Sequence, residues 1–352
     1  MLTLVTGSSG LIGSEAVAFF DRMGFDTIGV DNNMRREFFG PKGDTTQNRL
    51  RLEGQCKRFR HVTLDIRDRA GVERLFAEYP VELVIHAAAQ PSHDLAASRV
   101  FDDFEVNAMG TLNLLEATRR HRPGAVFIQV STNKVYGDGP NFVELKEEAT
   151  RYEYADPAYA HGISEAFSID QSKHSLFGAS KAAGDLLAQE YGRYFGMKTG
   201  VFRGGCLTGP QHAGVELHGF LNYLAYCAVN EKPYTIFGYK GKQVRDQIHC
   251  YDVINAFWQF AQKPRAGEVY NLGGGKGNSA SLIECVEMLA KATGGKRPMM
   301  SYNPENRIGD HICYYSDMRK FMSHYPAWTL TYTLEQIVEE MCECARRLRA
   351  VA

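Results

Sequence analysis

The chain has 352 residues, of which 44% are hydrophobic and 23% are charged. A chain of this length can bury a large core, in one large domain or in two smaller ones. The formal net charge is −1, so the protein lacks the overall positive field that draws proteins to nucleic acid. These values indicate a soluble globular protein and argue against nucleic acid as its partner.

Neither a membrane span nor a metal site is expected. No stretch approaches the roughly 20 apolar residues that cross a bilayer, and the N-terminus begins with a strand-like pattern instead of a secretory leader. The eight cysteines are scattered, and the pair Cys342 and Cys344 has no matching His or Cys cluster at zinc-ligand spacing. We therefore expect a cytoplasmic protein with reduced thiols.

Short apolar runs alternate with segments of helical period in the first 203 residues. The predicted strands are residues 2–6, 27–31, 61–65, 83–86, 125–131 and 199–203. The predicted helices are residues 14–23, 70–79, 100–120 and 180–195. This alternation predicts an α/β fold with a doubly wound parallel sheet, whose ligands bind at the carboxyl ends of the strands.

Two connections are too long for ordinary turns. Residues 32–59 are rich in Arg and Lys, and residues 139–174 hold several acids together with Tyr152, Tyr154 and Tyr159. Long ordered loops at the ligand end of a sheet are often lids or binding loops, and a plain surface excursion is the alternative.

The regular alternation weakens after residue 203. Helices are predicted at residues 217–230, 281–290 and 334–348, and strands at residues 234–237 and 269–272. This mixture predicts a smaller α/β lobe that lies over the sheet.

A glycine-rich segment, Gly-Ser-Ser-Gly-Leu-Ile-Gly, follows the first strand and opens the first helix. Glycines let the backbone approach phosphates, and the free amides and the helix dipole supply positive potential. The segment predicts a dinucleotide site, with a mere tight turn as the weaker alternative. The residues expected at the pyrophosphate are Gly7, Ser9, Gly10, Leu11, Ile12 and Gly13.

The carboxylate of Asp31 favours NAD over NADP. Asp31 follows Gly13 by 18 residues, at the end of the second strand, where it can accept hydrogen bonds from ribose hydroxyls and would repel a 2′-phosphate. Asn32 lies beside it, and Arg35 and Arg36 could soften this preference. At the end of the third strand Asp65 could likewise meet the adenine edge, and a helix N-cap is the alternative role.

Several segments together resemble the extended short-chain dehydrogenase/reductase family, whose members epimerise, dehydrate or decarboxylate nucleotide sugars. Besides the glycine segment, they are Asp65-Ile66, His86-Ala87-Ala88-Ala89, Asn107 with residues 110–117, Ser131-Thr132 and residues 135–137. The resemblance covers nearly the whole chain. It implies cofactor contacts from Asp65, Ile66, Ala87, Ala88, Ala89, Asn107 and Lys181.

The same resemblance implies two units. Residues 1–203 would form an NAD-binding Rossmann domain to which residues 245–272 return, and residues 204–244 and 273–352 would form a nucleotide-sugar-binding lobe. Relatives commonly pair through two helices of the first unit, here residues 100–120 and 180–195, so a homodimer is expected.

Within the family, residues 131–138, 150–152 and 241–246 are most similar to the CDP-paratose 2-epimerase subfamily. This similarity implies oxidation of a CDP-linked sugar at carbon 2 by bound NAD, exposure of the other face of the keto intermediate, and return of the hydride. Epimerisation at carbon 4, dehydration and decarboxylation begin with the same kind of oxidation and remain alternatives.

The sequence departs from the family pattern at Phe177. Members normally carry a Tyr four residues before the active-site Lys, here Lys181, and its tyrosinate takes the hydroxyl proton, which Phe cannot do. Lys181 can still hold the nicotinamide ribose, and Thr132 matches the family's substrate-binding Ser or Thr.

The missing base is therefore replaced, bypassed or absent. His174 is the nearest candidate with a suitable pKa, and a surface or capping role is its alternative. Lys173, Tyr136, Cys206 and a residue of the 139–174 connection are further candidates. Without any base, the chain would be a catalytically silent sensor of NAD and nucleotide sugar, and an engineered Tyr-to-Phe change is another alternative.

Arginines are expected at the sugar diphosphate. Arg245 and Arg307 fall where family members place such arginines, whose planar guanidinium suits bidentate binding of phosphate, and surface ion pairing is the alternative. Cys206 stands where many relatives have Asn near the diphosphate, although a buried apolar role fits it better. Further substrate contacts are expected from Asn133, Tyr136 and Arg203, whereas His86 is expected to be a packed structural residue.

Overall fold

A seven-stranded parallel sheet forms the centre of the protein. The computed structural model describes residues 1–211, 219–306 and 309–351. The strand order is β12 (Glu268–Leu272), β8 (Lys198–Gly204), β5 (Val126–Thr132), β4 (Leu83–His86), β1 (Leu2–Thr6), β2 (Asp26–Val30) and β3 (Phe59–Val62). Every neighbouring pair is parallel, which confirms the predicted doubly wound α/β fold.

Helices cover both faces of this sheet. One face packs on α1 (Leu11–Arg22), α3 (Thr46–Gln55) and α10 (Cys250–Gln262), and the other on α4 (Arg69–Glu78), α7 (Gly110–His121) and α8 (Ser175–Phe195). Leu4 and Val5 are neighbours in β1 and enter different apolar clusters, because successive strand residues point to opposite faces. The sheet therefore separates two cores.

The strand order reverses between β4 and β1, which lie side by side although they are far apart in sequence. In a doubly wound sheet, connections leave this point in opposite directions and a crevice opens at the carboxyl ends of the strands.

Several predicted elements differ from the structure. Residues 32–59 are not a loop, because they contain α2 (Met34–Phe39) and α3. Only Phe38 in α2 and Leu52 in α3 are buried, so neither helix has an apolar stripe that would reveal it. The third strand begins two residues earlier than predicted and ends at Val62, on the sheet edge, so Asp65 lies beyond it.

Residues 100–120 do not form one regular helix. They divide into α6 (Val100–Phe104), a π-helical turn (Glu105–Met109) and α7. Such turns insert one extra residue into a helix and often occur beside functional sites.

The connection 139–174 is ordered without long elements. Its strands β6 (Leu145–Glu147) and β7 (Tyr152–Tyr154) form an antiparallel pair. Tyr154 and Ile163 are buried against Tyr314 in β15 (Cys313–Tyr314) and the adjacent Tyr315. The connection therefore packs on the C-terminal part of the chain.

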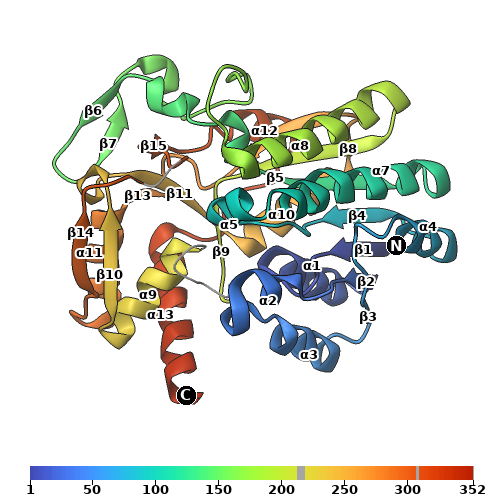
Figure 1. Cartoon of the computed structure of the whole chain (residues 1–352), viewed down its shortest axis with the longest axis horizontal. Coiled ribbons are helices and arrows are strands. Elements are labelled where there is room, and N and C mark those ends of the chain that lie inside the picture. The colour runs from blue at the N-terminus through green and yellow to red at the C-terminus, as the bar shows by residue number, and fades with distance from the viewer. Residues whose placement is uncertain (212–218, 307–308, 352) are drawn as a thin grey trace.

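The predicted smaller lobe is confirmed and lies to the left of the large sheet in Figure 1. It contains α9 (Phe220–Asn230), α11 (Leu282–Thr293), α13 (Leu334–Val351), and the parallel pair β10 (Pro233–Phe237) and β14 (Met299–Asn303). A further small sheet joins β13 (Ser279–Ser281), β11 (Val244–His249), β15 and β9 (Cys206–Thr208). No helix in the described ranges combines the length and apolar composition needed to cross a bilayer.

A buried ion pair fixes α8 to the sheet. Arg203 in β8 donates from Nε and Nη2 to the carboxylate of Asp185 in α8, at 3.0 and 2.9 Å. Ser131 Oγ and Gln189 Nε2 donate to the same carboxylate, both at 2.6 Å. Because all four side chains are buried, this network fixes the position of the helix that carries Phe177 and Lys181.

Candidate functional site

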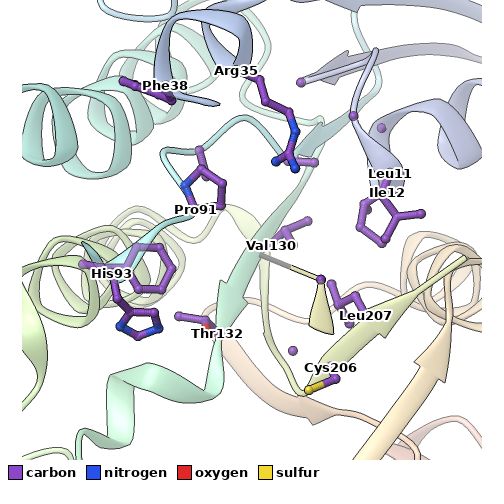
Figure 2. Close-up of a pocket in the computed structure, with 18 of the residues that line it drawn as sticks. Leu11, Ile12, Arg35, Phe38, Pro91, His93, Val130, Thr132, Cys206 and Leu207 are labelled. Carbon is purple, nitrogen blue, oxygen red and sulfur yellow. The ribbon is translucent and has the colours of Figure 1, made fainter. Parts of the chain in front are cut away.

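One large cavity of about 560 Å³ opens at the carboxyl ends of the central strands. Its wall begins at the glycine segment after β1, passes the ends of β2, β4 and β5, and reaches α9, β10 and β11 of the smaller lobe. Figure 2 shows Leu11, Arg35, Thr132 and Cys206 around this space. The crevice expected at the strand-order reversal is therefore present.

The glycine segment leaves room only for backbone. Gly7 has φ +66°, and a Cβ added there would lie 2.8 Å from the backbone nitrogen of Ala88. A Cβ on Gly13 would overlap the carbonyl oxygen of Gly7. Side chains are thus excluded where α1 begins, so its free amide groups face the cavity as a pyrophosphate requires.

Backbone amides orient the carboxylate of Asp31. Its Oδ2 accepts a hydrogen bond from Ser9 N at 3.0 Å and its Oδ1 accepts one from Asn33 N at 2.8 Å. The remaining lone pairs of the carboxylate can accept hydrogen bonds from two ribose hydroxyls. Arg35 also lines the cavity, whereas Arg36 forms an exposed ion pair with Asp44 at 3.3 Å.

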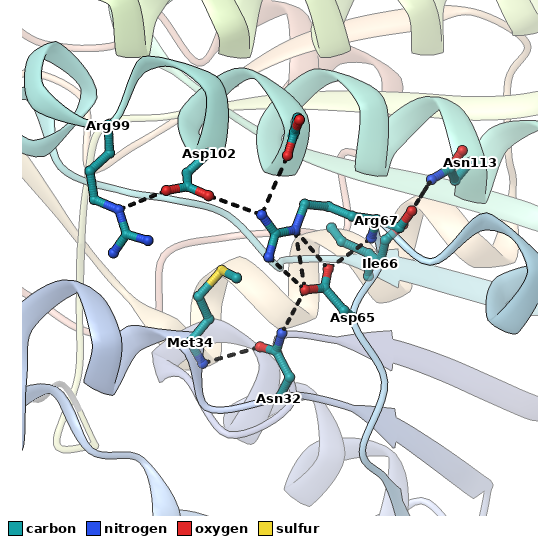
Figure 3. A network of polar contacts seen from close by, with 9 residues as sticks. Asn32, Met34, Asp65, Ile66, Arg67, Arg99, Asp102 and Asn113 are labelled. Carbon is teal, nitrogen blue, oxygen red and sulfur yellow. Dashed lines mark hydrogen bonds and ion pairs between the residues drawn. The ribbon is translucent and has the colours of Figure 1, made fainter.

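Asp65 belongs to a polar network with Asn32 and Arg67, shown in Figure 3. Asn32 Nδ2 donates to Asp65 Oδ2 at 3.2 Å, and Arg67 Nη2 donates to the same oxygen at 2.9 Å. The alternative N-cap role of Asp65 is wrong, because Asp68 caps α4 by accepting from Gly71 N at 3.0 Å. Asp65 lines the cavity, and so do Asn32, Ile66, Ala87, Ala88 and Ala89.

Phe177, Lys181 and Thr132 all line the cavity. Phe177 and Lys181 are four residues apart in α8 and so share one helix face. Lys181 Nζ donates to Val130 O at 2.8 Å, and burial lowers the pKa of Lys181 to about 8. Thr132 Oγ1 accepts from Lys134 N at 3.2 Å.

Two cations and one acid line the cavity toward the smaller lobe. Arg245 Nη2 pairs with Asp310 Oδ1, and Lys134 Nζ lies 3.8 Å from the same carboxylate. Burial lowers the pKa of Lys134 to about 8, while Arg245 and Lys134 lower the pKa of Asp310 despite its burial. The predicted residues Asn133 and Cys206 line this part as well, and Arg307 lies outside the described residues.

Asn107 is placed behind the cavity wall. Its side chain is buried, with Nδ2 donating to Gln90 O at 3.1 Å and to Ser180 Oγ at 3.0 Å, and Oδ1 accepting from Gln90 N at 3.0 Å. It therefore connects the π-helical turn, the segment after β4 and α8, instead of lining the predicted cofactor site.

Tyr136 and Arg203 also lie away from the cavity wall. Tyr136 is fully buried and its hydroxyl donates to Asn271 Oδ1 at 2.7 Å, while burial raises its pKa to about 12. Arg203 is held by Asp185. Neither is placed to contact substrate, and Tyr136 would not ionise near neutral pH.

The other candidate bases are no better placed. His174 lies off the cavity wall, and its Nδ1 and Nε2 lie 2.9 and 2.8 Å from the carbonyl oxygens of Ser172 and Val135. Lys173 is exposed, and residues 139–174, all of them described, contribute nothing to the wall. Cys206 lines the cavity, but burial raises the pKa of its thiol to about 11.

His86 is the structural residue that its position predicts. It is fully buried, with Nδ1 2.7 Å from Thr6 Oγ1 and Nε2 3.0 Å from Thr111 Oγ1. Burial lowers the pKa of His86 to about 3, so the ring is neutral.

Several cavity residues are absent from the sequence-based predictions. His93 lines the wall beside Phe177, and their ring centroids are 4.8 Å apart. Gln247 also lines the wall, and its amide has no hydrogen-bond partner among the described residues although it is fully buried. The smaller lobe adds aromatic rings, namely Phe220, Tyr223, Tyr234 and Phe237. Lys134 alone had a sequence signal, since it directly follows the predicted Asn133.

Comparison with known proteins identifies relatives over most of the chain. The family model described as "NAD dependent epimerase/dehydratase family" matches residues 3–273. CDP-paratose 2-epimerase of Salmonella typhi is 35% identical over 297 residues, which are 82% of this chain and 83% of that protein. The dTDP-glucose 4,6-dehydratase of Salmonella typhimurium is 29% identical over 78% of this chain and 72% of its own.

Solved structures show the same architecture. The UDP-glucose 4-epimerase of Thermus thermophilus, in complex with NAD, is 27% identical with a TM-score of 0.77, covering 98% of this chain and 99% of its own. A mutant UDP-glucuronic acid 4-epimerase of Bacillus cereus, in complex with UDP-4-deoxy-4-fluoro-glucuronic acid and NAD, is 25% identical with a TM-score of 0.80. It covers 99% of this chain and 100% of its own.

The substitution Gly13→Ala tests the glycine segment. We expect NAD binding to weaken by at least about tenfold, ~1.4 kcal/mol, because the new methyl group must displace the Gly7 carbonyl from a tightly packed turn. Calorimetric titration with NAD measures the change. Gly54→Ala in α3 is the control, since its Cβ meets nothing within 4 Å, and equal affinities in the two variants would contradict the assignment.

Proposed function

Since this chain belongs to the NAD-dependent epimerase/dehydratase family, we propose that it epimerises carbon 2 of a CDP-linked sugar. The family assignment confirms the predicted resemblance and NAD as the cofactor. The choice of the nucleotide and of the reacting carbon goes beyond the family assignment and is our proposal.

One observation carries the proposal: a single cavity extends from the expected dinucleotide site to the cations Arg245 and Lys134. The glycine segment and Asp31 lie at one end, Thr132 and Lys181 in the middle, and Arg245 in the smaller lobe. A ligand there can place a sugar between nicotinamide and diphosphate sites. The buried amide of Gln247, without a protein partner in the described chain, supports a polar ligand at this end.

The choice of a CDP-sugar and of carbon 2 is supported by similarity to the Salmonella typhi 2-epimerase, at 35% identity. Dehydratases match at lower identity, 25–29%, and cover comparable shares of the chain.

In this mechanism, bound NAD supplies the hydride acceptor for a reversible oxidation of the sugar. The glycine segment and Asp31 hold the dinucleotide, and Lys181 holds the nicotinamide ribose. Thr132 can hydrogen-bond the reacting hydroxyl. Arg245 and Lys134 retain the diphosphate while the keto sugar turns its other face, so that the returning hydride inverts the carbon.

Aromatic rings in the smaller lobe suit the nucleotide base. Phe220, Tyr223 and Tyr234 line the cavity, and the rings of Tyr223 and Tyr234 are 5.9 Å apart. Aromatic faces bind bases by stacking, which alone distinguishes poorly between bases.

Product analysis tests the proposed reaction. The purified protein with NAD is incubated with matched CDP-, UDP-, GDP- and dTDP-linked sugars, and the products are assigned by NMR. We expect inversion at carbon 2 of a CDP-sugar without net consumption of NAD. Inversion at carbon 4 or loss of water would replace the proposal by another reaction of the family, and no product from any sugar would favour a binding protein.

The substitution Arg245→Ala tests the diphosphate site. We expect binding of the CDP-sugar to weaken by about 1.5–3 kcal/mol, the range for hydrogen bonds to charged groups, with NAD binding unchanged. Calorimetric titration of the NAD-loaded protein measures both affinities. Arg297→Ala, at an exposed arginine that pairs with Glu287, is the control, and an unchanged affinity in Arg245→Ala would remove this residue from the site.

We also propose that two copies associate through α6–α8. Phe101 and Tyr194 are 83% and 80% exposed there, and Phe104, Met109, Leu186 and Phe195 are also exposed. Exposed apolar side chains on neighbouring helices support an association surface. Light scattering should give twice the chain mass, and Phe101→Asp should shift the protein to the monomer. A monomeric unsubstituted protein would contradict this interface.

A further inference from the structure

We propose that His93 is the general base of this site, occupying the role that Phe177 cannot perform. The proposal rests on the proposed function, because a base is needed only if a sugar hydroxyl is oxidised here. Oxidation requires the hydroxyl to lose its proton as the carbon loses hydride, and a neutral imidazole is suited to take that proton near neutral pH.

His93 lies directly beside Phe177, the residue at the position of the missing tyrosine. It lines the cavity, and its ring contacts the ring of Phe177 edge to face, with centroids 4.8 Å apart. In Figure 2, His93 and Thr132 both lie in the lower left of the view, whereas Arg35 enters it from the top. A proton acceptor on this wall can reach a hydroxyl held between Thr132 and the nicotinamide site.

Buried polar side chains hold the segment that carries His93 in place. Gln90 accepts a hydrogen bond from Ser92 N at 2.6 Å, and its amide donates to Asp103 Oδ1 at 2.8 Å. Asn107 holds the backbone of Gln90. His93 then begins α5 (His93–Ser98), where the Ser92 side chain caps the helix. A preorganised base needs such support, because proton transfer depends on short and well-aligned contacts.

Ser175 can fix the tautomer of His93. The Nδ1 atom of His93 lies 3.2 Å from Ser175 Oγ, which also accepts a hydrogen bond from Gly178 N at 3.2 Å. A hydroxyl oxygen has two lone pairs, so the second can accept a proton carried by Nδ1. In this tautomer Nε2 carries the lone pair that accepts the substrate proton, and Ser175 is a positioning residue.

The proton and electrons balance in both directions. The substrate O–H bond breaks and its proton moves to Nε2, so His93 becomes an imidazolium. The oxygen keeps the bonding electrons and forms the carbonyl, as the hydrogen on carbon leaves with its electron pair to the nicotinamide ring. When the hydride returns to the other face of the carbon, His93 gives the proton back and is neutral again.

Charged groups of both signs lie on the same wall. Asp94 follows His93 in α5, and Lys181 comes from α8. Gly309 lies beside His93, since a Cβ added there would be 3.7 Å from His93 Nδ1, and Lys134 Nζ donates to Gly309 O at 2.9 Å. Asp310 follows Gly309 and pairs with Arg245. Lys134 and Lys181, with pKa values of about 8, lose their protons on the alkaline side of the rate profile. The loss of activity that we assign to His93 is therefore sought on the acid side.

The test compares His93→Gln with His161→Gln, a control at an exposed histidine, in the NAD-loaded protein. We expect His93→Gln to lower kcat about 10²–10⁴-fold, while its affinities for NAD and the nucleotide sugar stay within about twofold of those of the unsubstituted protein. His161→Gln should change neither kcat nor these affinities. The acid limb of the rate profile should disappear in His93→Gln. Phe177→Tyr added to His93→Gln should restore turnover at least tenfold, because it places a phenol four residues before Lys181.

Histidine NMR adds a readout that is independent of turnover. The imidazole resonance of His93 is identified as the one that is missing from the spectrum of His93→Gln. In the unsubstituted protein it should titrate with pH and shift when the nucleotide sugar binds. Ser175→Ala should move the acid limb to lower pH, because an acceptor at Nδ1 stabilises the imidazolium. A resonance that neither titrates nor responds to the sugar would overturn the role of His93.

The outcomes separate the two proposals. If the unsubstituted protein is active and His93→Gln turns over at the same rate, the role of His93 is overturned and the proposed function stays intact. An unsubstituted protein that converts no nucleotide sugar overturns the proposed function, and the role of His93 with it.

Discussion

Everything in this site depends on how closely three backbone segments approach one another at the end of β1. Gly7, Gly13 and the segment at Ala88 meet at distances that exclude any Cβ. This contact fixes the start of α1 against the ends of β1 and β4 and keeps its amides open to the cavity. The carboxylate of Asp31 is then oriented by an amide of the same turn, at Ser9. At this point the wall of the cavity is shaped by the packing of backbone against backbone.

The other walls are supported by polar networks in the protein interior. Asp185 and Arg203 fix α8, and Asn107 with Gln90 fixes the segment that leads to His93. These residues do not line the cavity, yet they set the relative positions of Lys181, Phe177 and His93. Buried and fully hydrogen-bonded networks of this kind are rigid because every alternative arrangement leaves a polar group without a partner.

The sequence was sufficient for the sheet, for most covering helices and for the glycine segment, since their signals are local. Periodicity failed for α2 and α3, which bury one side chain each. It also could not show that Tyr136 and Arg203 face interior partners, because Asn271 and Asp185 lie on other elements and meet them only in the folded chain. His93 was missed for the same reason: its neighbour Phe177 lies 84 positions further along the chain.

The contact between Arg245 and Asp310 affects which anions the cavity retains. A phosphate that approaches this guanidinium has to compete with a carboxylate that is already attached, so a small free anion gains little by exchanging with it. A ligand that also fills the space beside Gln247 and the aromatic rings has further contacts to offset that competition. On this argument, inorganic phosphate and other simple salts should compete poorly for the cavity with a ligand of the proposed kind.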